Sequence, residues 1–176
     1  MTGRDAIALQ PLDEAVDHVR GPAAGRVILE YGDYECPYSR AAYRQIQSVL
    51  RSEGDGVRFA FRHFPLTEIH PHALAASAAA EAAALRGSFW QMHDLLFHRQ
   101  KALDDESLRR YAGELELDVA RFDGDRTSAA VLGRIRRDVE SGLASGQVAG
   151  TPTLFVDGVV IRGGYDAARL LEALGR

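Results

Sequence analysis

The chain has 176 residues and a formal net charge of −4 at pH 7, so it has the size of one domain and no basic surplus to attract nucleic acid. No run of about 18 apolar residues predicts a membrane span, and the first 20 residues lack the pattern of a signal peptide. With a single cysteine in the chain, we expect a cytoplasmic protein with no nucleic-acid partner and no membrane partner. The sequence carries no sign of its oligomeric state.

A strand, a helix and a second strand are predicted in the first third of the chain. Residues 26–31 form an apolar, β-branched run typical of a strand, and residues 37–50 have apolar side chains at helical spacing. After a glycine-containing turn, residues 57–63 alternate between apolar and mostly polar side chains, which predicts a strand with one polar face. A strand, helix and strand of these lengths imply a parallel pair.

Helices dominate the middle of the chain, and strands return only at its end. The helical patterns cover residues 73–85, 89–100, 104–115 and 127–144, and we interpret the region from about 66 to 146 as a helical insertion. Asp157-Gly158 between two apolar runs, 153–156 and 159–162, predicts a β-hairpin. A last amphipathic helix is predicted over 166–174.

Cys36 stands where the first strand ends and the first helix begins, in the run Cys36-Pro37-Tyr38-Ser39. A sulfur at that point faces unpaired backbone N–H groups and the positive end of the helix dipole, which favour the thiolate over the thiol. A proline in the first helical turn loses no hydrogen bond. We therefore predict that Cys36 is a nucleophile and not an inert buried thiol.

Ser39 occupies the position at which a dithiol enzyme carries its second sulfur. Because the chain contains no other cysteine, Cys36 cannot form a disulfide within it, and an adduct on Cys36 would need an external thiol for its release. The Ser39 hydroxyl is a candidate hydrogen-bond donor to the Cys36 thiolate. The alternative is an ordinary serine on the helix surface.

The chain resembles the DsbA family of thioredoxin-fold proteins in motifs that extend from about residue 25 to the C-terminus. These motifs are Gly32-Asp33-Tyr34-Glu35-Cys36-Pro37-Tyr38, Arg62-His63-Phe64-Pro65-Leu66, His70-Pro71, Phe89-Trp90, His93-Asp94 and Gly150-Thr151-Pro152-Thr153-Leu154-Phe155-Val156-Asp157-Gly158. The resemblance implies an α/β, thioredoxin-like fold with an inserted helical domain. It places an N-terminal extension over 1–24 and the DsbA-like domain over 25–176.

The same resemblance implies the roles of the site residues. Cys36 matches the family's nucleophile, and Pro37 with Tyr38 matches the dipeptide of its redox-active centre. A cis peptide bond between Thr151 and Pro152 is expected next to the sulfur, in a loop whose backbone pairs with an extended substrate.

Ser39 departs from the family pattern, because dithiol oxidase activity requires a cysteine there. The resemblance thus implies a monothiol thiol–disulfide oxidoreductase that acts on protein or small-molecule disulfides. We expect it to bind no cofactor and to use glutathione or another small thiol as co-substrate. The Pro37-Tyr38 pair also resembles glutaredoxins, which remove glutathione with their first cysteine alone.

Other interpretations of the cysteine stay open. The chain fits a non-catalytic redox-sensing or binding module, and it fits an engineered trap in which a serine replaces the second cysteine. A glutathione-dependent transferase or isomerase is a further alternative, since a related branch of the fold has serine at the start of the active-site helix. Retention of Cys36 at the first position disfavours that branch.

The histidines and aromatic residues are predicted to be structural. His93 and His98 lie five residues apart and do not share a helix face, and no second cysteine is available as a zinc ligand, so no metal site is expected. His63 and His70 are interpreted as packing or loop-capping groups. Trp90, with the neighbouring Phe89 and Met92, is assigned to the core of the helical insertion.

Overall fold

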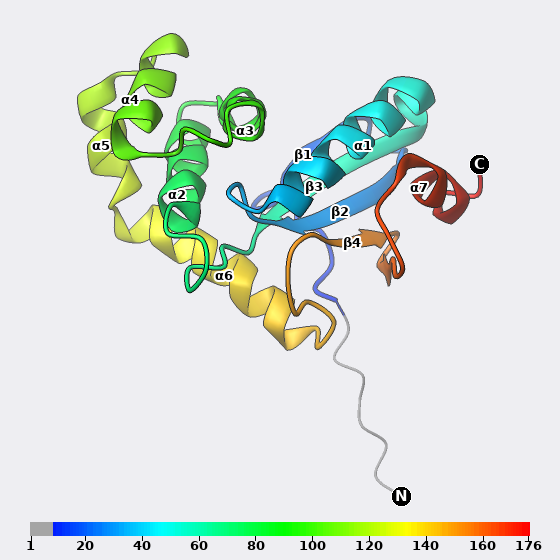
Figure 1. The fold of residues 1–176 in the computed structure, drawn as a ribbon. Helices are drawn as coiled ribbons and strands as arrows, with labels where there is room; N and C mark the ends of the chain where they lie inside the picture. Colours follow the sequence, from blue (N-terminus) through cyan, green and yellow to red (C-terminus); the bar gives the residue numbers. More distant parts are fainter. Residues whose placement is uncertain (1–8) are drawn as a thin grey trace, which may run out of the picture.

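The computed structural model describes residues 9–176 and contains a five-stranded sheet with helices on both faces (Figure 1). The strands are His18–Arg20 (β1), Arg26–Gly32 (β2), Val57–His63 (β3), Thr153–Val156 (β4) and Val159–Val160 (β5). Their order is β1-β3-β2-β4-β5; β2 and β3 are parallel, and the other neighbours are antiparallel. The predicted parallel pair and the predicted hairpin at Asp157-Gly158 are both confirmed.

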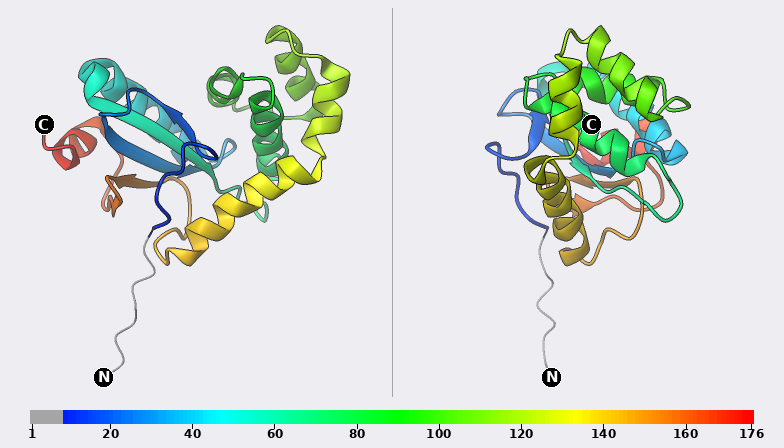
Figure 2. Two further views of the ribbon diagram at one scale, coloured as in Figure 1. Left: turned by 180° about the vertical axis from the view of Figure 1, so that it is seen from behind. Right: turned by 90° about the vertical axis from the view of Figure 1, so that its left-hand side faces the viewer.

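The helices divide between the faces of the sheet and a separate block. They are Pro37–Glu53 (α1), Ala73–Ala84 (α2), Phe89–His98 (α3), Asp105–Glu114 (α4), Val119–Arg126 (α5), Ala129–Ala144 (α6) and Ala167–Ala173 (α7), with a short 3-10 turn at Gly54–Gly56 (η1). Helices α1 and α7 cover one face of the sheet, while α6 runs from the helical block across the other face (Figures 1 and 2). Helices α2 to α5 form the block, which confirms the predicted helical insertion.

Two elements, β1 and α5, were not predicted from the sequence. Strand β1 lies inside residues 1–24, the segment predicted to be an N-terminal extension, and it pairs with β3, so the sheet begins before residue 25. With three residues it is too short to show a period. Helix α5 has Gly124 in its interior, which weakens its helical pattern, although Asp118 caps it by accepting a hydrogen bond from the Arg121 N–H (3.1 Å).

Strand β3 is buried on both faces, whereas its sequence predicts one polar face. Its arginines are covered because they have partners: the guanidinium of Arg62, which is fully buried, donates to both carboxylate oxygens of Asp17 at 2.9 and 2.8 Å and to the Tyr31 hydroxyl at 2.9 Å. Burial alone would raise the pKa of Asp17, but the hydrogen bonds and charge of Arg62 outweigh it and lower that pKa to about 2. The ion pair joins the segment before β1 to strand β3.

Replacing Asp17 by asparagine should destabilise the protein by about 3–5 kcal/mol at pH 7, because it leaves the Arg62 charge buried without a counter-charge. Since the pKa of Asp17 is depressed, its contribution is complete at neutral pH and is lost as the pH falls towards about 2. Urea unfolding at pH 7 measures the effect. Asp105→Asn is the control, because Asp105 is an exposed partner of Arg126 and should change stability by less than about 1 kcal/mol; equal effects of the two variants would contradict the expectation.

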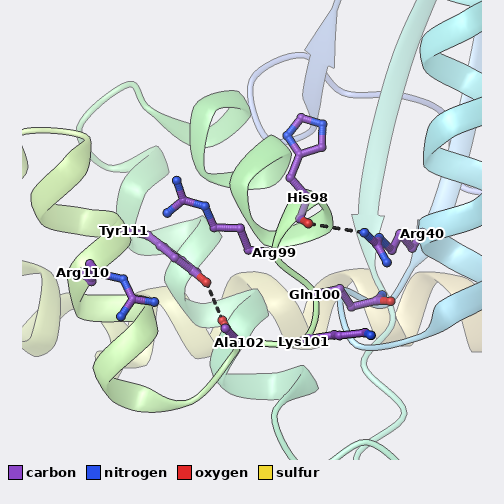
Figure 3. Close-up of a pocket in the computed structure, with 8 residues that line it drawn as sticks. All are labelled: Arg40, His98, Arg99, Gln100, Lys101, Ala102, Arg110 and Tyr111. Carbon is purple, nitrogen blue, oxygen red and sulfur yellow. Dashed lines mark hydrogen bonds between the residues drawn. The ribbon is translucent and has the colours of Figure 1, made fainter.

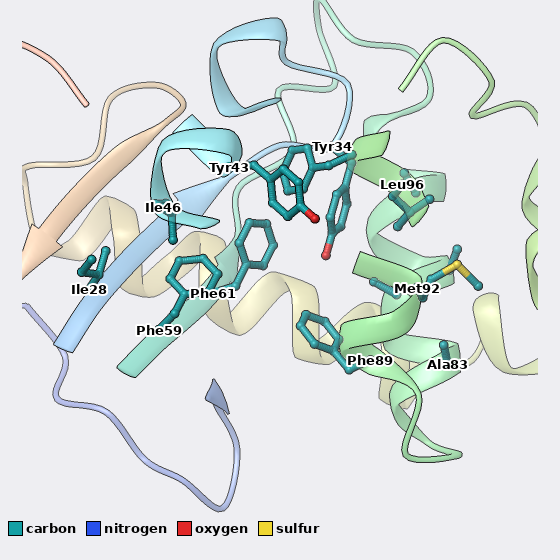
Figure 4. Close-up of a cluster of buried hydrophobic side chains, with 14 of the residues drawn as sticks. Ile28, Tyr34, Tyr43, Ile46, Phe59, Phe61, Ala83, Phe89, Met92 and Leu96 are labelled. Atoms are coloured by element: carbon teal, nitrogen blue, oxygen red, sulfur yellow. The ribbon is translucent and has the colours of Figure 1, made fainter. Parts of the chain in front are cut away.

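The main core is continuous from the sheet into the helical block. Phe61 from β3, Tyr43 from α1, and Phe89 and Met92 from α3 belong to one buried cluster (Figure 4). Phe89 and Met92 are therefore core residues, as predicted, and Trp90 packs at the edge of the cluster. This shared core holds α3 and the chain that follows it in a set position beside the start of α1.

Candidate active site

Cys36 lies at the N-terminal end of α1, as predicted. Its N–H donates to the Asp33 carbonyl (3.1 Å), and its carbonyl accepts the N–H of Arg40 (3.1 Å), so both the loop before it and the first helical turn hold its backbone. Pro37 is in the first turn of the helix. Only 3% of Cys36 is exposed, so the surrounding chain covers almost all of it.

The loop before β4 contacts the sulfur. The Cys36 Sγ donates to the carbonyl oxygen of Thr151 at 3.3 Å, and the peptide bond between Thr151 and Pro152 is cis, as predicted. Because only a protonated sulfur can donate, this hydrogen bond belongs to the thiol form. Thr151 precedes the first residue of β4, so its backbone lies outside the strand ladder. The structure thus brings together Cys36, Thr151 and Pro152.

Ser39 is buried, and the alternative of a helix-surface serine is wrong. Its Oγ accepts a hydrogen bond from the Asp33 N–H at 3.2 Å, and within residues 9–176 it has no hydrogen bond with Cys36. The hydroxyl oxygen is the acceptor in that contact, so its hydrogen remains available to a second acceptor. Donation from Ser39 to a Cys36 thiolate stays a prediction.

Asp33 holds the active-site loop in place. Its fully buried carboxylate accepts hydrogen bonds from the N–H groups of Glu35 (2.8 Å) and Leu66 (2.9 Å) and lies 2.7 Å from Nδ1 of His70. The loop-capping interpretation of His70 is confirmed. Sequence reasoning missed the part played by Asp33, because two of the three groups that it binds, the Leu66 N–H and the His70 ring, lie more than 30 residues away in the chain.

Gln100 connects the helical block to the backbone of Cys36. Its Nε2 donates to the carbonyl oxygens of Tyr34 (2.7 Å) and Cys36 (2.9 Å). A glutamine just after a helix has no pattern that would distinguish it in the sequence. The contact means that the connection between α3 and α4 is part of the site.

Glu30 is a buried acid on β2, six residues before Cys36. Within the described chain neither of its carboxylate oxygens has a hydrogen-bond partner, and burial raises its pKa to about 8. At neutral pH it is therefore mostly a neutral carboxyl group that can exchange a proton in the physiological range. The signal that could have revealed it is an acid in the middle of an otherwise apolar strand.

One group within residues 9–176 has three metal-ligating atoms close together: His18, His63 and Glu81. Each histidine Nε2 lies 2.7 Å from the same carboxylate oxygen of Glu81, a hydrogen-bonding distance. Burial opposes ionisation of Glu81, but these hydrogen bonds outweigh it and hold its pKa below the usual range. The carboxylate is thus satisfied by the two imidazoles, and the expectation of no metal site remains a prediction.

Three large apolar side chains are exposed on the first turn of α1 and on the segment from Ile69 to Leu74. Tyr38 is 64% exposed, and Ile69 is 68% exposed on the segment that His70 fastens to Asp33. Leu74, at the start of α2, is also exposed. Large apolar side chains in the open are suited to contact with a substrate chain.

The family model described as "Thioredoxin" matches residues 14–176. The crystal structure of a thioredoxin-like oxidoreductase from Silicibacter pomeroyi is 25% identical, has a TM-score of 0.80, and aligns over 99% of this chain and 97% of that one. BdbD from Bacillus subtilis is 21% identical with a TM-score of 0.80, over 97% of each chain. Wolbachia pipientis alpha-DsbA1 is 19% identical with a TM-score of 0.78, over 95% of this chain and 92% of that one.

Curated relatives of the chain are named as ion antiporters. A protein of Herminiimonas arsenicoxydans named Na(+)/H(+) antiporter NhaA is 45% identical over 165 residues, which are 93% of this chain and 26% of that protein. A second, from Salinispora tropica and named Na(+)/H(+) antiporter NhaA 3, is 44% identical over 93% of this chain. The chain spans about a quarter of the length of these relatives. None of the helices within residues 9–176 has the length and apolar character needed to cross a bilayer.

Proposed function

Since the chain belongs to the thioredoxin family and has a DsbA-like fold with a helical insertion, we propose that it is a thiol–disulfide oxidoreductase that works through Cys36 alone. The observation that carries the proposal is the position of the Cys36 sulfur. It lies at the N-terminal end of α1, 3.3 Å from the Thr151 carbonyl of the cis-proline loop. The N-terminus of a helix is a position that in general favours a thiolate over a thiol, and the thiolate is the nucleophile in disulfide exchange.

The reaction has two exchange steps. In the first, the Cys36 thiolate attacks one sulfur of a disulfide, a new bond forms between the two sulfurs, and the other half of the substrate leaves as a thiolate. In the second, an external thiolate attacks the mixed disulfide and restores the Cys36 thiolate. The half that was held on Cys36 leaves joined to the external thiol as a new disulfide. The external thiol is thereby oxidised while the half released in the first step is reduced, so electrons balance without a second cysteine in the chain.

The surroundings of the sulfur support an extended substrate. The Thr151 carbonyl becomes free when Cys36 ionises, because the thiol proton that it accepts is then gone. A substrate strand can pair with the backbone of Thr151, which lies outside the strand ladder, while Tyr38 and Ile69 offer apolar contact. Protein disulfides and mixed disulfides with a small thiol such as glutathione are thus the proposed substrates.

Two alternatives make different predictions. A redox-sensing module or a trap would form the Cys36 adduct but would not turn over, because nothing would resolve it. A glutathione-dependent transferase or isomerase would activate the thiol of bound glutathione and would not need the Cys36 sulfur. The monothiol route requires both the Cys36 adduct and its release.

Turnover of 2-hydroxyethyl disulfide in the presence of a free thiol tests the proposal. The protein should accelerate the exchange, whereas Cys36→Ala should give only the uncatalysed rate, and Cys36→Ser should match it. Circular dichroism confirms that each variant is folded. Equal activity of the protein and Cys36→Ala would remove the thiol from the mechanism, and an adduct without turnover would favour the sensor or trap.

A further inference from the structure

A cationic cavity of about 520 Å³ lies between α1, the connection from α3 to α4, and α4 itself (Figure 3). Four of the side chains that line it are cationic, and none is acidic: Arg40, Arg99, Lys101 and Arg110 supply the charges. The whole chain has a net charge of −4, so a cavity whose charged side chains are all cationic differs from the acidic balance of the chain. The volume lies within the range of about 300–1,000 Å³ that is usual for small-molecule sites.

Most of this charge has no ion-pair partner among residues 9–176: Arg40 donates only to the His98 carbonyl and Arg110 only to the Ser107 hydroxyl. Arg99 forms an ion pair with Glu114, at 2.8 Å from both carboxylate oxygens. Arg40, Lys101 and Arg110 have no ion pair with any residue in the range 9–176 that the structure describes. These three side chains remain able to bind the carboxylate groups of a ligand.

The cavity lies next to the backbone of Cys36. Arg40 lies in the first turn of α1, and its backbone N–H donates to the Cys36 carbonyl at 3.1 Å. Gln100, also in the wall, donates to the Cys36 carbonyl at 2.9 Å. The cavity is therefore next to the backbone of the residue whose sulfur would exchange with a small molecule.

We propose that the cationic cavity binds the carboxylate groups of a low-molecular-weight thiol or disulfide while its sulfur exchanges at Cys36. The inference rests on the proposed function and adds a substrate class, namely anionic small disulfides in preference to neutral or cationic ones. The sulfur chemistry is the exchange described above. The cavity contributes attraction and orientation and takes no part in the bond changes.

Three small disulfides of similar size test the preference: 3,3′-dithiodipropionate (anionic), 2-hydroxyethyl disulfide (neutral) and cystamine (cationic). The second-order rate of adduct formation on Cys36 is followed by quenching and intact-mass measurement, and each rate is divided by that of a free cysteine peptide with the same disulfide. At low ionic strength the normalised anionic rate should exceed the cationic rate by about tenfold or more. The ratio should shrink in about 1 M salt, where the Debye length is near 3 Å.

Reversing charges in the cavity distinguishes the effect of its local electrostatic field from the effect of the net charge of the whole protein. Lys101→Glu with Arg110→Glu, both at exposed positions, should abolish or invert the preference and leave the neutral rate within about twofold. Arg121→Glu with Arg136→Glu is the matched control, because it makes the same charge change at exposed positions outside the cavity. Lys101→Ala with Arg110→Ala should reduce the preference without inverting it.

The outcomes distinguish the two proposals. An adduct with the neutral disulfide but no anionic preference overturns the cavity inference and leaves the proposed function standing. An equal loss of preference in the control pair also overturns it, because the effect then belongs to overall charge. If none of the three disulfides reacts with Cys36, the proposed function itself fails.

Discussion

Ser39→Cys is expected to confer catalytic oxidation of a reduced dithiol peptide, with a rate about 100-fold or more above that of the unmodified chain. A second sulfur in the third position of α1 would attack the mixed disulfide on Cys36 within the same molecule, and intramolecular attack far outruns that of a dilute external thiol. The substitution exchanges one atom at a fully buried position. Oxidation of the peptide, with a small disulfide as the final oxidant, is the measurement.

Ser77→Cys is the matched control for that substitution. Ser77 is also fully buried, but it lies on α2 and outside the contacts of the site, so a sulfur there adds a thiol without a route to Cys36. It should leave dithiol oxidation at the level of the unmodified chain. If Ser39→Cys oxidised the peptide no faster than Ser77→Cys, a sulfur at position 39 would not be within reach of the mixed disulfide on Cys36, and the expectation would be wrong.

Glu30→Gln should stabilise the protein strongly at alkaline pH and little at acidic pH. Burial raises the pKa of Glu30 from 4.5 to about 8, so the unfolded chain releases this proton several pH units before the folded chain does. The stability of the unmodified protein therefore falls as the pH rises from about 4.5 to about 8, and the loss then stays constant. Glutamine has no proton to release, so its advantage should grow across this window to roughly 4–5 kcal/mol.

Urea unfolding at pH 5 and at pH 8.5 measures that difference. Glu68→Gln is the control, because Glu68 is exposed and its replacement should change stability by less than about 0.5 kcal/mol at both pH values. A gain for Glu30→Gln that was the same at both pH values would show that its carboxyl group is already ionised in the folded protein at pH 5.

The features that the sequence predicted correctly are those that depend on residues adjacent in the chain. Cys36 and Pro37 stand at a boundary between a strand pattern and a helix pattern, and the boundary itself indicates the helix end. Asp157-Gly158 predicts a turn because both residues need a positive φ there, as the structure shows. The cis bond before Pro152 came from a family resemblance and not from the local pattern.

The missed features depend on residues that meet only in the folded chain. Gln100 binds the carbonyl of Cys36 across 64 positions of sequence, and Asp33 binds His70 across 37. The burial of Arg62 likewise depends on Asp17, which lies 45 residues away in a segment without a strand pattern. Spacing in a single sequence carries no information about such pairs, because their closeness is decided by the order of strands in the sheet and by the packing of the helical block.

Release of a preformed mixed disulfide tests the monothiol route itself. Cys36 is first converted to its adduct with 2-mercaptoethanol by means of the neutral disulfide, and excess reagent is removed. The rate at which the free protein reappears is then followed by intact mass at several concentrations of glutathione. A single-cysteine mechanism requires a rate that rises linearly with glutathione and extrapolates to zero without it. Release at a rate independent of glutathione, or an adduct that glutathione leaves intact, would contradict it.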